Sequence, residues 1–396
     1  MNKNDNVTYL AGVKNVSSRP FEPYDELLCE FLNDLSSDLR SSEESSADPD
    51  VMAFAFWCRK GNIAKLKTDF KNGEARLGLG VVFHITPSNV PVNFVFSFVF
   101  GLLSGNANIV RVPSKPFPQI GIICAAIDRL FATDKYREIK AMTAFVRYEQ
   151  NDEITGKFSA NCNARIIWGG DETIRNIRKL AIPERCVDIA FSDRYSLCVI
   201  DAPSVIELDE TELISLSERF YNDTYLMDQN ACSSPHLIIW VGDGKEKAKE
   251  RFWTAIYRTV VEKYQLAAVN AVDKYTMLCQ NAVELNNIKS VTKHGNYIYR
   301  IAIDRVLDNI DSLRGKFGYF FEYNTDDINN IAHIINTKYQ TLTYFGLDKS
   351  YLLDFVIKNR LSGIDRIVPV GTALDMDVIW DGYDIVRSLS RIIKVK

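Results

Sequence analysis

The sequence predicts an α/β protein built on two open sheets whose strands are mostly parallel. Residues 79–85 form a continuous apolar, β-branched run, which is typical of a strand covered on both faces. A proline-containing turn, an apolar helical segment at 93–103 and a second strand at 108–112 follow it, which is the order of a parallel βαβ unit. Strands and helices alternate again beyond residue 206, and 396 residues leave room for two or three domains.

Two helices are expected before the first sheet. Apolar residues recur with helical spacing over residues 24–39, and a second helix is expected over 51–70, broken or bent near Gly61. Residues 41–50 lie between them and are acidic and serine-rich, which predicts a solvated loop. The amino-terminal part of the chain should therefore be helical and lie outside the sheet.

The first sheet draws its strands from five short apolar runs. We expect strands at residues 79–85, 108–112, 144–148, 165–168 and 195–201, with helices at 93–103, 117–131 and about 171–180. An open, doubly wound sheet of this kind binds ligands beyond the carboxyl ends of its strands. The turns that follow these strands are therefore candidate sites.

A second unit is expected from residue 206 onward. A helix at 210–221 leads into a polar loop, which is followed by a strand at 236–241 and a helix at 245–264. Residues 265–300 carry few clear signals, and strands at 318–323 and 342–345 flank a helix at 326–336. These patterns predict domains at 1–205 and 206–370, and a segment at 371–396 that returns to the first domain or to an oligomer interface.

Composition and charge argue against several classes of function. The net charge is −4 and the basic residues are scattered, so there is no footprint for nucleic acid. The eight cysteines and four histidines show no Cys-x-x-Cys, zinc-finger or His-Glu-x-x-His spacing, so no metal site is expected. The amino-terminal residues do not form a signal peptide and the apolar stretch 90–103 is too short to span a bilayer, which predicts a cytoplasmic protein with reduced thiols.

Cys232 is the residue whose surroundings best suit a nucleophile. It lies in Met-Asp-Gln-Asn-Ala-Cys-Ser-Ser-Pro at residues 227–235, directly before the apolar run of the predicted strand. Small neighbours leave room for a carbonyl to approach the sulfur, and a reactive thiolate needs such a partly accessible place on a rigid element. Free cysteine is also among the most buried residue types, so a packed, inert thiol is the alternative interpretation.

Other polar residues follow the strands of the first sheet, each with a structural alternative. Asn89, in a proline-stiffened turn, could donate to an oxyanion or form an Asx turn. Gly169-Gly170 opens a helix and could approach a phosphate or form a plain tight turn. Arg111, with Ser114 nearby, could bind a ribose or its 2′-phosphate or lie on the surface. His84 is expected to be a core residue, whereas His236 could reach Cys232 only if the chain folds back.

Four motifs together resemble one protein family. They are Phe-His-Ile-Thr-Pro-Ser-Asn-Val-Pro at 83–91, Gly-Leu-Leu-Ser-Gly-Asn-Ala-Asn-Ile-Val-Arg-Val-Pro-Ser at 101–114, Asp-Arg-Ile-Val-Pro-Val-Gly at 365–371 and Trp-Asp-Gly at 380–382. From about residue 77 the chain resembles the LuxC-like acyl-CoA reductases of bacterial bioluminescence, in the aldehyde dehydrogenase superfamily. The resemblance implies an aldehyde dehydrogenase-like fold, with a Rossmann-like NADP-binding domain over 1–205 and a catalytic domain over 206–370.

The resemblance also implies roles for particular residues. Cys232 matches the catalytic cysteine, and Asn89 matches the asparagine that binds the oxyanion. One departure is informative: Phe-Ser-Asp-Arg at 191–194 replaces the Glu-Leu-Gly-Gly of oxidising members, so the glutamate that activates water is missing. Another departure, Gly-Lys-Phe-Gly at 315–318, lacks the ribose-binding glutamate. The residues that match cofactor-binding positions are Arg111, Ser114, Gly169, Gly170 and Phe317.

The implied activity is the reduction of acyl-CoA, or of another acyl thioester, to a fatty aldehyde with NADPH through an S-acyl intermediate on Cys232. Arg111 is the reason to expect NADPH rather than NADH. The resemblance further implies an acyl carrier or an acyl-protein synthetase as partner, and a homo-oligomer. Two alternatives remain: an NAD(P)-dependent aldehyde dehydrogenase that works in the oxidising direction, and a non-catalytic scaffold that binds the synthetase.

Overall fold

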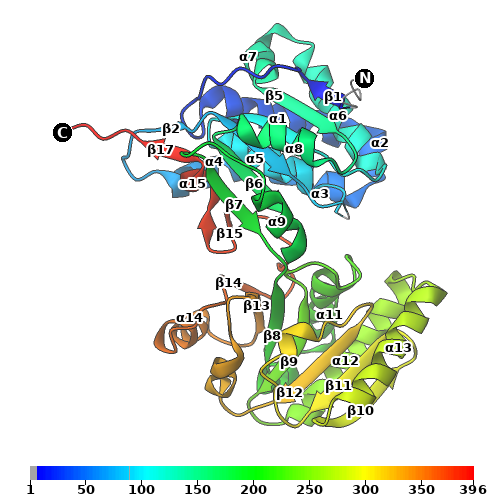
Figure 1. The fold of residues 1–396 in the computed structure, drawn as a ribbon. Helices are drawn as coiled ribbons and strands as arrows, with labels where there is room; N and C mark the ends of the chain where they lie inside the picture. Colours follow the sequence, from blue (N-terminus) through cyan, green and yellow to red (C-terminus); the bar gives the residue numbers. More distant parts are fainter. Residues whose placement is uncertain (1–6, 89) are drawn as a thin grey trace. The chain divides into compact units, whose positions relative to one another are not determined.

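The computed structural model describes residues 7–88 and 90–396, which fold into two compact units (Figure 1). Unit 1 contains the chain up to Ser192 and again Asp377–Lys396. Unit 2 contains Asp193–Met376. Unit 2 is therefore inserted into unit 1, and each is described below by itself.

Unit 1 begins with β1 (Thr8–Gly12) and four helices. Helix α1 (Glu26–Ser41) starts at Asp25, whose carboxylate accepts the Leu27 N–H at 2.9 Å, and it buries the apolar stripe expected from its sequence. The expected loop at 41–50 instead contains α2 (Glu43–Ser46), because Ser42 caps that turn and Pro49 starts the next helix. The expected helix at 51–70 is divided at 58–59, two to three residues before Gly61, into α3 (Pro49–Trp57) and α4 (Lys60–Phe70).

The sheet of unit 1 has the order β1-β5-β4-β3-β6-β7, and every neighbouring pair is parallel except β1 with β5. The chain runs outward from β3 through β4 to β5 and then returns to β6 on the other side. The carboxyl ends of β3 and β6 are therefore the switch point at which such sheets bind ligands. The elements are β3 (Val81–Ile85), α5 (Asn93–Leu103), β4 (Ala107–Arg111), α6 (Pro118–Phe131), α7 (Arg137–Ala141), β5 (Thr143–Arg147), α8 (Asp152–Ala160), β6 (Ala164–Trp168), α9 (Asp171–Arg178) and β7 (Val187–Phe191).

A buried polar network crosses the core of unit 1. His84 lies 2.8 Å from Ser97 Oγ through Nδ1 and 3.0 Å from Asn108 Oδ1 through Nε2, and Trp168 Nε1 donates to the same Ser97 hydroxyl at 3.0 Å. Burial lowers the pKa of His84 to about 4, so the ring is neutral. The prediction that His84 is a hydrogen-bonded core histidine is confirmed.

The carboxyl-terminal segment of the chain completes unit 1. It contains β15 (Ile379–Trp380), β16 (Tyr383–Asp384), α15 (Ile385–Ser388) and β17 (Ser390–Ile392), and β17 pairs antiparallel with β2 (Arg76–Gly78), as Figure 1 shows in red beside β2. The Arg76 guanidinium fastens this pair, because it donates to the carbonyls of Arg387 at 2.7 Å and Ser390 at 2.8 Å. Strands separated by more than 300 residues in the sequence are thus neighbours.

Unit 2 is a seven-stranded sheet in the order β10-β11-β12-β9-β8-β13-β14, parallel except between β10 and β11. The expected helix at 326–336 is a 3₁₀ helix, and the unassigned region 265–300 contains a full helix and an edge strand. The elements are β8 (Tyr195–Asp201), α10 (Ala202–Glu207), α11 (Glu210–Thr224), β9 (Pro235–Val241), α12 (Lys245–Lys263), α13 (Ala268–Glu284), β10 (Ile288–His294), β11 (Ile298–Ile303), β12 (Tyr319–Asn324), η3 (Ile328–Ile334), β13 (Tyr339–Phe345), α14 (Lys349–Lys358) and β14 (Arg366–Pro369).

The boundary between the units differs from the expected division at 205–206. Strand β8, assigned from its sequence to the first sheet, lies in the interior of the second, where it pairs with β9 and β13. Its apolar run continues the strand–helix alternation of unit 1 without a break, so sequence pattern alone does not show which sheet it joins. The return to unit 1 likewise comes at Asp377 rather than at residue 371.

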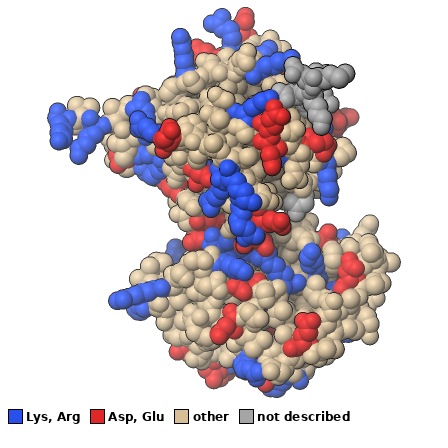
Figure 2. All heavy atoms as spheres, viewed as in Figure 1, with Lys and Arg blue, Asp and Glu red and all other residues tan. Residues whose placement is uncertain are grey.

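None of the helices within residues 7–88 and 90–396 is long and apolar enough to cross a membrane. In the same residues, no cluster of His, Cys, Asp and Glu side chains has the arrangement of a metal site. Lys and Arg side chains are interspersed with Asp and Glu on the face drawn in Figure 2.

Candidate active site

The Cys232 loop, residues 225–234, joins α11 to the amino end of β9. Two of its residues, Asp228 (φ 53°) and Gln229 (φ 60°), have left-handed backbone conformations, which let the chain reverse direction within a few residues. Such conformations are unfavourable for a residue with a Cβ unless surrounding contacts stabilise them. The loop should therefore be held by contacts that lie outside it.

Gln229 provides four of these contacts. Its side chain is 1% exposed, and Nε2 donates to the carbonyls of Pro235 at 3.1 Å and Tyr319 at 3.0 Å. Its Oε1 accepts the N–H groups of Gly318 at 3.2 Å and Tyr319 at 3.1 Å. All four hydrogen-bonding positions of the amide are thus satisfied, and the loop is fastened to the start of β12.

Cys232 lies on the part of the loop that the sheet holds directly. Its carbonyl accepts the Ser196 hydroxyl at 2.7 Å, and that hydroxyl oxygen accepts the Thr341 N–H at 3.2 Å, so β8 and β13 together fix the Cys232 backbone. Ser234 Oγ donates to the Asp223 carbonyl at 2.7 Å and joins the loop to α11. Cys232 is half-buried. A partly accessible thiol on a rigid backbone is the environment that nucleophilic catalysis requires.

A buried lysine supports the loop through hydrogen bonds to neighbouring backbone. Lys274 of α13 is fully buried, and its Nζ donates to the carbonyls of Phe317 at 2.6 Å and Tyr297 at 3.1 Å. Phe317 in turn donates its N–H to the Asp228 carbonyl at 3.2 Å. Burial lowers the pKa of Lys274 to about 7. Sequence analysis missed Lys274, although it shares a helical spacing with the buried Leu278 and Asn281.

His236 does not act as a charged partner for the thiol. It is 2% exposed, lies in β9 and stacks on Tyr195 with ring centroids 5.3 Å apart. Burial lowers its pKa to about 3, so the imidazole is neutral at physiological pH. At this end of the sheet His236 packs on Tyr195 and hydrogen-bonds the Gly315 backbone.

The candidate cofactor residues of unit 1 lie at the carboxyl edge of its sheet. Arg111 ends β4; its guanidinium lies 4.5 Å from the Tyr148 ring centroid, and its carbonyl accepts the Thr86 hydroxyl at 2.6 Å. Gly169 follows β6, and Gly170 is the N-cap of α9. Ser114 is exposed, three residues beyond β4. Asn89 lies outside the described residues, and Phe317 belongs to unit 2, where its backbone meets the Cys232 loop.

The carboxyl ends of the unit 1 strands fit a dinucleotide in part. A Cβ added at Gly170 would meet no atom within 4 Å, so the turn is open to a ligand. The first turn of α9, however, carries Asp171 and Glu172, which oppose a phosphate at the helix end. Arg111 supplies positive charge at the same edge. The residues therefore fit a cofactor whose phosphate is met by Arg111 more readily than by the end of α9.

Phe191 is packed in an aromatic stack where the motif match would place a catalytic glutamate. It is 4% exposed, its ring centroid lies 3.9 Å from that of Trp168 with 22° between the planes, and Tyr383 contacts it edge-on at 5.9 Å. The nearby carboxylate of Asp193 pairs with Arg314 at 2.6 Å within unit 2. Phe191 has no group that could activate water.

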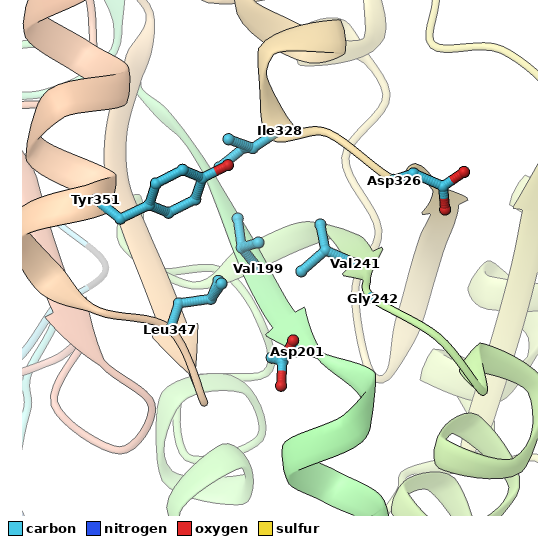
Figure 3. Close-up of a pocket in the computed structure, with 8 residues that line it drawn as sticks. All are labelled: Val199, Asp201, Val241, Gly242, Asp326, Ile328, Leu347 and Tyr351. Atoms are coloured by element: carbon cyan, nitrogen blue, oxygen red, sulfur yellow. The ribbon is translucent and has the colours of Figure 1, made fainter.

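A cavity of about 210 Å³ lies at the carboxyl ends of the unit 2 strands, opposite to the end that carries the Cys232 loop (Figure 3). Its walls include Val199 and Asp201 at the carboxyl end of β8 and Val241 at the carboxyl end of β9, whereas Cys232 precedes the amino end of β9. The Asp201 carboxylate is engaged by the Ser204 N–H at 3.0 Å. This cavity therefore does not serve the thiol.

Comparison with known proteins places the chain. The profile of the family described as acyl-CoA reductase (LuxC) matches residues 65–394. The chain belongs to this family. It is 24% identical to a long-chain acyl-protein thioester reductase of Vibrio harveyi over 80% of this chain and 63% of that protein. A Photorhabdus luminescens protein of the same name is 25% identical over 43% of this chain and 34% of its own length. The chain thus matches less than two thirds of either relative.

Solved structures show the fold of this LuxC-family chain. An NAD-dependent benzaldehyde dehydrogenase from Corynebacterium glutamicum superposes with a TM-score of 0.61 at 14% identity, covering 98% of this chain and 94% of that one. Glyceraldehyde-3-phosphate dehydrogenase GapN from Methanocaldococcus jannaschii, complexed with NADP, gives a TM-score of 0.62 at 13% identity, covering 93% and 88%. The predicted aldehyde dehydrogenase-like fold and the family are confirmed.

Proposed function

We propose that this protein reduces acyl thioesters to aldehydes, with Cys232 as the residue that carries the acyl group. The observation that carries the proposal is the Cys232 loop itself: a half-buried thiol whose backbone is fastened to β8 and β13 through Ser196. Membership of the acyl-CoA reductase family and the names of the two relatives support the same reaction.

The chemistry of Cys232 would run in two stages. The thiolate attacks the carbonyl carbon of the thioester, a new C–S bond forms, and the carrier leaves as its thiolate. The negative charge on the carbonyl oxygen needs a donor, and the Cys232 backbone N–H and the Asn89 amide are our candidates. After the acyl carbon has accepted a hydride, Cys232 holds the oxyanion of a thiohemiacetal. Breaking of the C–S bond then releases the aldehyde and restores the thiolate.

The hydride would come from NADPH, which supplies it from its nicotinamide ring when bound. Arg111 at the carboxyl end of β4 supports NADPH, because a guanidinium matches the geometry of a 2′-phosphate. The buried Phe191 supports reduction over oxidation, since an acyl-enzyme that meets no activated water persists until hydride arrives. Gly169, Gly170, Ser114 and Phe317 are the further cofactor-binding residues of this proposal.

Acyl transfer to the protein tests the proposal directly. The chain is incubated with radiolabelled tetradecanoyl-CoA and no cofactor, and label that stays with denatured protein is counted. We expect label that hydroxylamine releases, as for a thioester, and none in Cys232→Ala. Cys279→Ala is the control, because Cys279 is more exposed than Cys232 and lies on α13, outside the loop. Label that persists in Cys232→Ala rules out the assignment.

A second arm of the same experiment tests the direction of the reaction and the cofactor. Adding NADPH to the labelled protein should release the label as tetradecanal, and NADH should do so more slowly. Release as tetradecanoic acid would instead indicate an aldehyde dehydrogenase that works in the oxidising direction. Equal rates with the two cofactors would remove the role given to Arg111.

A further inference from the structure

Two cysteines of unit 1 lie side by side, apart from the candidate active site. Cys162 precedes β6, Cys186 precedes β7, and these strands are parallel neighbours in the sheet. Their sulfur atoms are 3.7 Å apart. A disulfide needs about 2.05 Å between sulfurs, so a side-chain adjustment of less than about 2 Å would join them.

The two thiols have different surroundings. Cys162 is 1% exposed and its Sγ lies 3.2 Å from the Ser159 carbonyl, whereas Cys186 is partly exposed. The Cys162 thiol faces the Cys186 sulfur and, by hydrogen bonding to it, lowers the pKa of Cys186. Of the charged side chains nearby, Arg165 favours a thiolate at Cys186 and Asp188 opposes it. Cys186 is thus the accessible, more acidic member, and Cys162 is the buried one.

We propose that Cys162 and Cys186 form a redox-active dithiol that peroxide converts into a disulfide. The Cys186 thiolate attacks one oxygen of hydrogen peroxide; an S–O bond forms, the O–O bond breaks and hydroxide leaves. The Cys162 sulfur then attacks the sulfur of this sulfenic acid; an S–S bond forms, the S–O bond breaks, and the oxygen leaves as water with the Cys162 proton. The dithiol loses two electrons and the peroxide gains them.

The disulfide would enclose one strand–turn–helix segment of unit 1. The chain between the two cysteines contains β6, the Gly169-Gly170 turn and α9. Arg165 already holds the end of this segment, because its guanidinium donates to the Ile177 carbonyl at 3.1 Å and pairs with Asp188 at 3.0 Å. A covalent link across its base would limit the opening of this segment. This inference concerns unit 1 and does not depend on the proposed reduction of thioesters.

Peptide mapping of the full chain tests the dithiol. The protein is treated with hydrogen peroxide, its remaining thiols are alkylated, and it is digested with trypsin without reductant. Cleavage after lysine and arginine places Cys162 in the peptide 158–165 and Cys186 in the peptide 186–194. We expect these two peptides to be joined at about 2 Da below their summed mass, and to separate after dithiothreitol.

Two variants assign the roles of the cysteines. In Cys162→Ser the sulfenic acid at Cys186 should persist and react with dimedone, whereas in Cys186→Ser the peptide with Cys162 should remain unoxidised. Cys124→Ser, which removes a buried cysteine in α6, should still form the link. The proposal is overturned if oxidised wild-type protein yields no joined peptide, or if Cys162 is oxidised at an unchanged rate in Cys186→Ser.

Discussion

Gln229 and Lys274 are buried polar side chains that hold the Cys232 loop in place, one from within the loop and one from α13. Gln229 hydrogen-bonds the start of β12. Lys274 hydrogen-bonds the segment at 315–319. A buried polar group is favourable only while its partners remain in place. Both residues should therefore control how firmly Cys232 is held, although neither is expected to touch substrate.

Replacing Gln229 with leucine should destabilise unit 2. The substitution leaves the N–H groups of Gly318 and Tyr319 buried without the acceptor that they now share. We expect a loss of about 2–6 kcal/mol in the free energy of unfolding, measured by urea titration, because each of the two buried unpaired N–H groups costs about 1–3 kcal/mol. Asn230→Leu, at the exposed neighbouring position, is the control and should change it by less than about 0.5 kcal/mol. Equal losses in Gln229→Leu and Asn230→Leu would contradict the role given to the Gln229 hydrogen bonds.

Lys274→Met should change how stability depends on pH. The unfolded chain keeps the lysine proton up to a pH of about 10.4, whereas the folded chain releases it near the lowered pKa of about 7. Between these values the unfolded state binds more protons, so this residue makes the free energy of unfolding rise with pH. Urea titrations at several pH values should show that the variant lacks this rise. Lys316→Met, which removes an exposed amine, is the control. Parallel profiles for wild type and Lys274→Met would contradict the assignment.

The turn before β12 is the element on which these contacts converge. Phe317 (φ 57°) and Gly318 (φ 84°) both have left-handed backbones there. A Cβ at Gly318 would lie 2.2 Å from the Tyr297 carbonyl oxygen and 2.3 Å from the Tyr225 hydroxyl. Because one of these atoms belongs to the backbone, the turn has no room to relax.

Gly318→Ala should therefore destabilise the protein and slow acylation of Cys232. We expect the free energy of unfolding to fall by about 2–4 kcal/mol, because alanine is strained in the left-handed conformation and its Cβ would meet the close contacts. Gly156→Ala is a control of opposite sign: it lies inside α8, an added Cβ meets nothing within 4 Å, and alanine should stabilise the helix by about 0.5–1 kcal/mol. Thermal unfolding measures the stability of both variants. An unchanged stability in Gly318→Ala would show that the turn adapts.

The elements that could be predicted from sequence are those whose apolar pattern matches their burial. Strand β3 is buried at all five positions and α5 at ten of its eleven, so a continuous apolar run is a reliable sign of both. Helix α13 was missed because its pattern is partly inverted: Val269, Val272 and Val283 are exposed, whereas Lys274 and Asn281 are buried beside Leu278. Periodicity assumes that apolar residues face inward, and this helix does not follow that rule.

The candidate site could be predicted only as far as it is local in sequence. Cys232 was singled out by its immediate neighbours and by the motif match. The partners of Gln229 come from Gly318 and Tyr319, about 90 residues further on, and no local pattern connects them. Gly169-Gly170 was predicted either to approach a phosphate or to form a plain tight turn, and Asp171 and Glu172 in the first turn of α9 weigh against a phosphate at that helix end.

At the scale of the whole molecule, unit 1 is discontinuous in sequence, and β17 closes it by pairing with β2. Deleting residues 390–396 should loosen unit 1 and leave unit 2 unchanged, because Arg76 loses its acceptors on Ser390. Hydrogen exchange followed by mass spectrometry should show faster exchange at 76–78 and unchanged exchange at β9 and β12. Deleting only 394–396 is the control, since Ile393 keeps its bond to the Ala75 carbonyl. Faster exchange in both units would contradict this independence.

The insertion of unit 2 into unit 1 has a consequence for biosynthesis. During translation, every residue of unit 2 leaves the ribosome before Asp377–Lys396 does. Unit 2 can therefore fold to completion while β2 (Arg76–Gly78) is still unpaired, because β17 has not yet left the ribosome. Over that interval an unpaired strand edge is open to other chains, and a chaperone that shields it would act before the last helix and strand arrive.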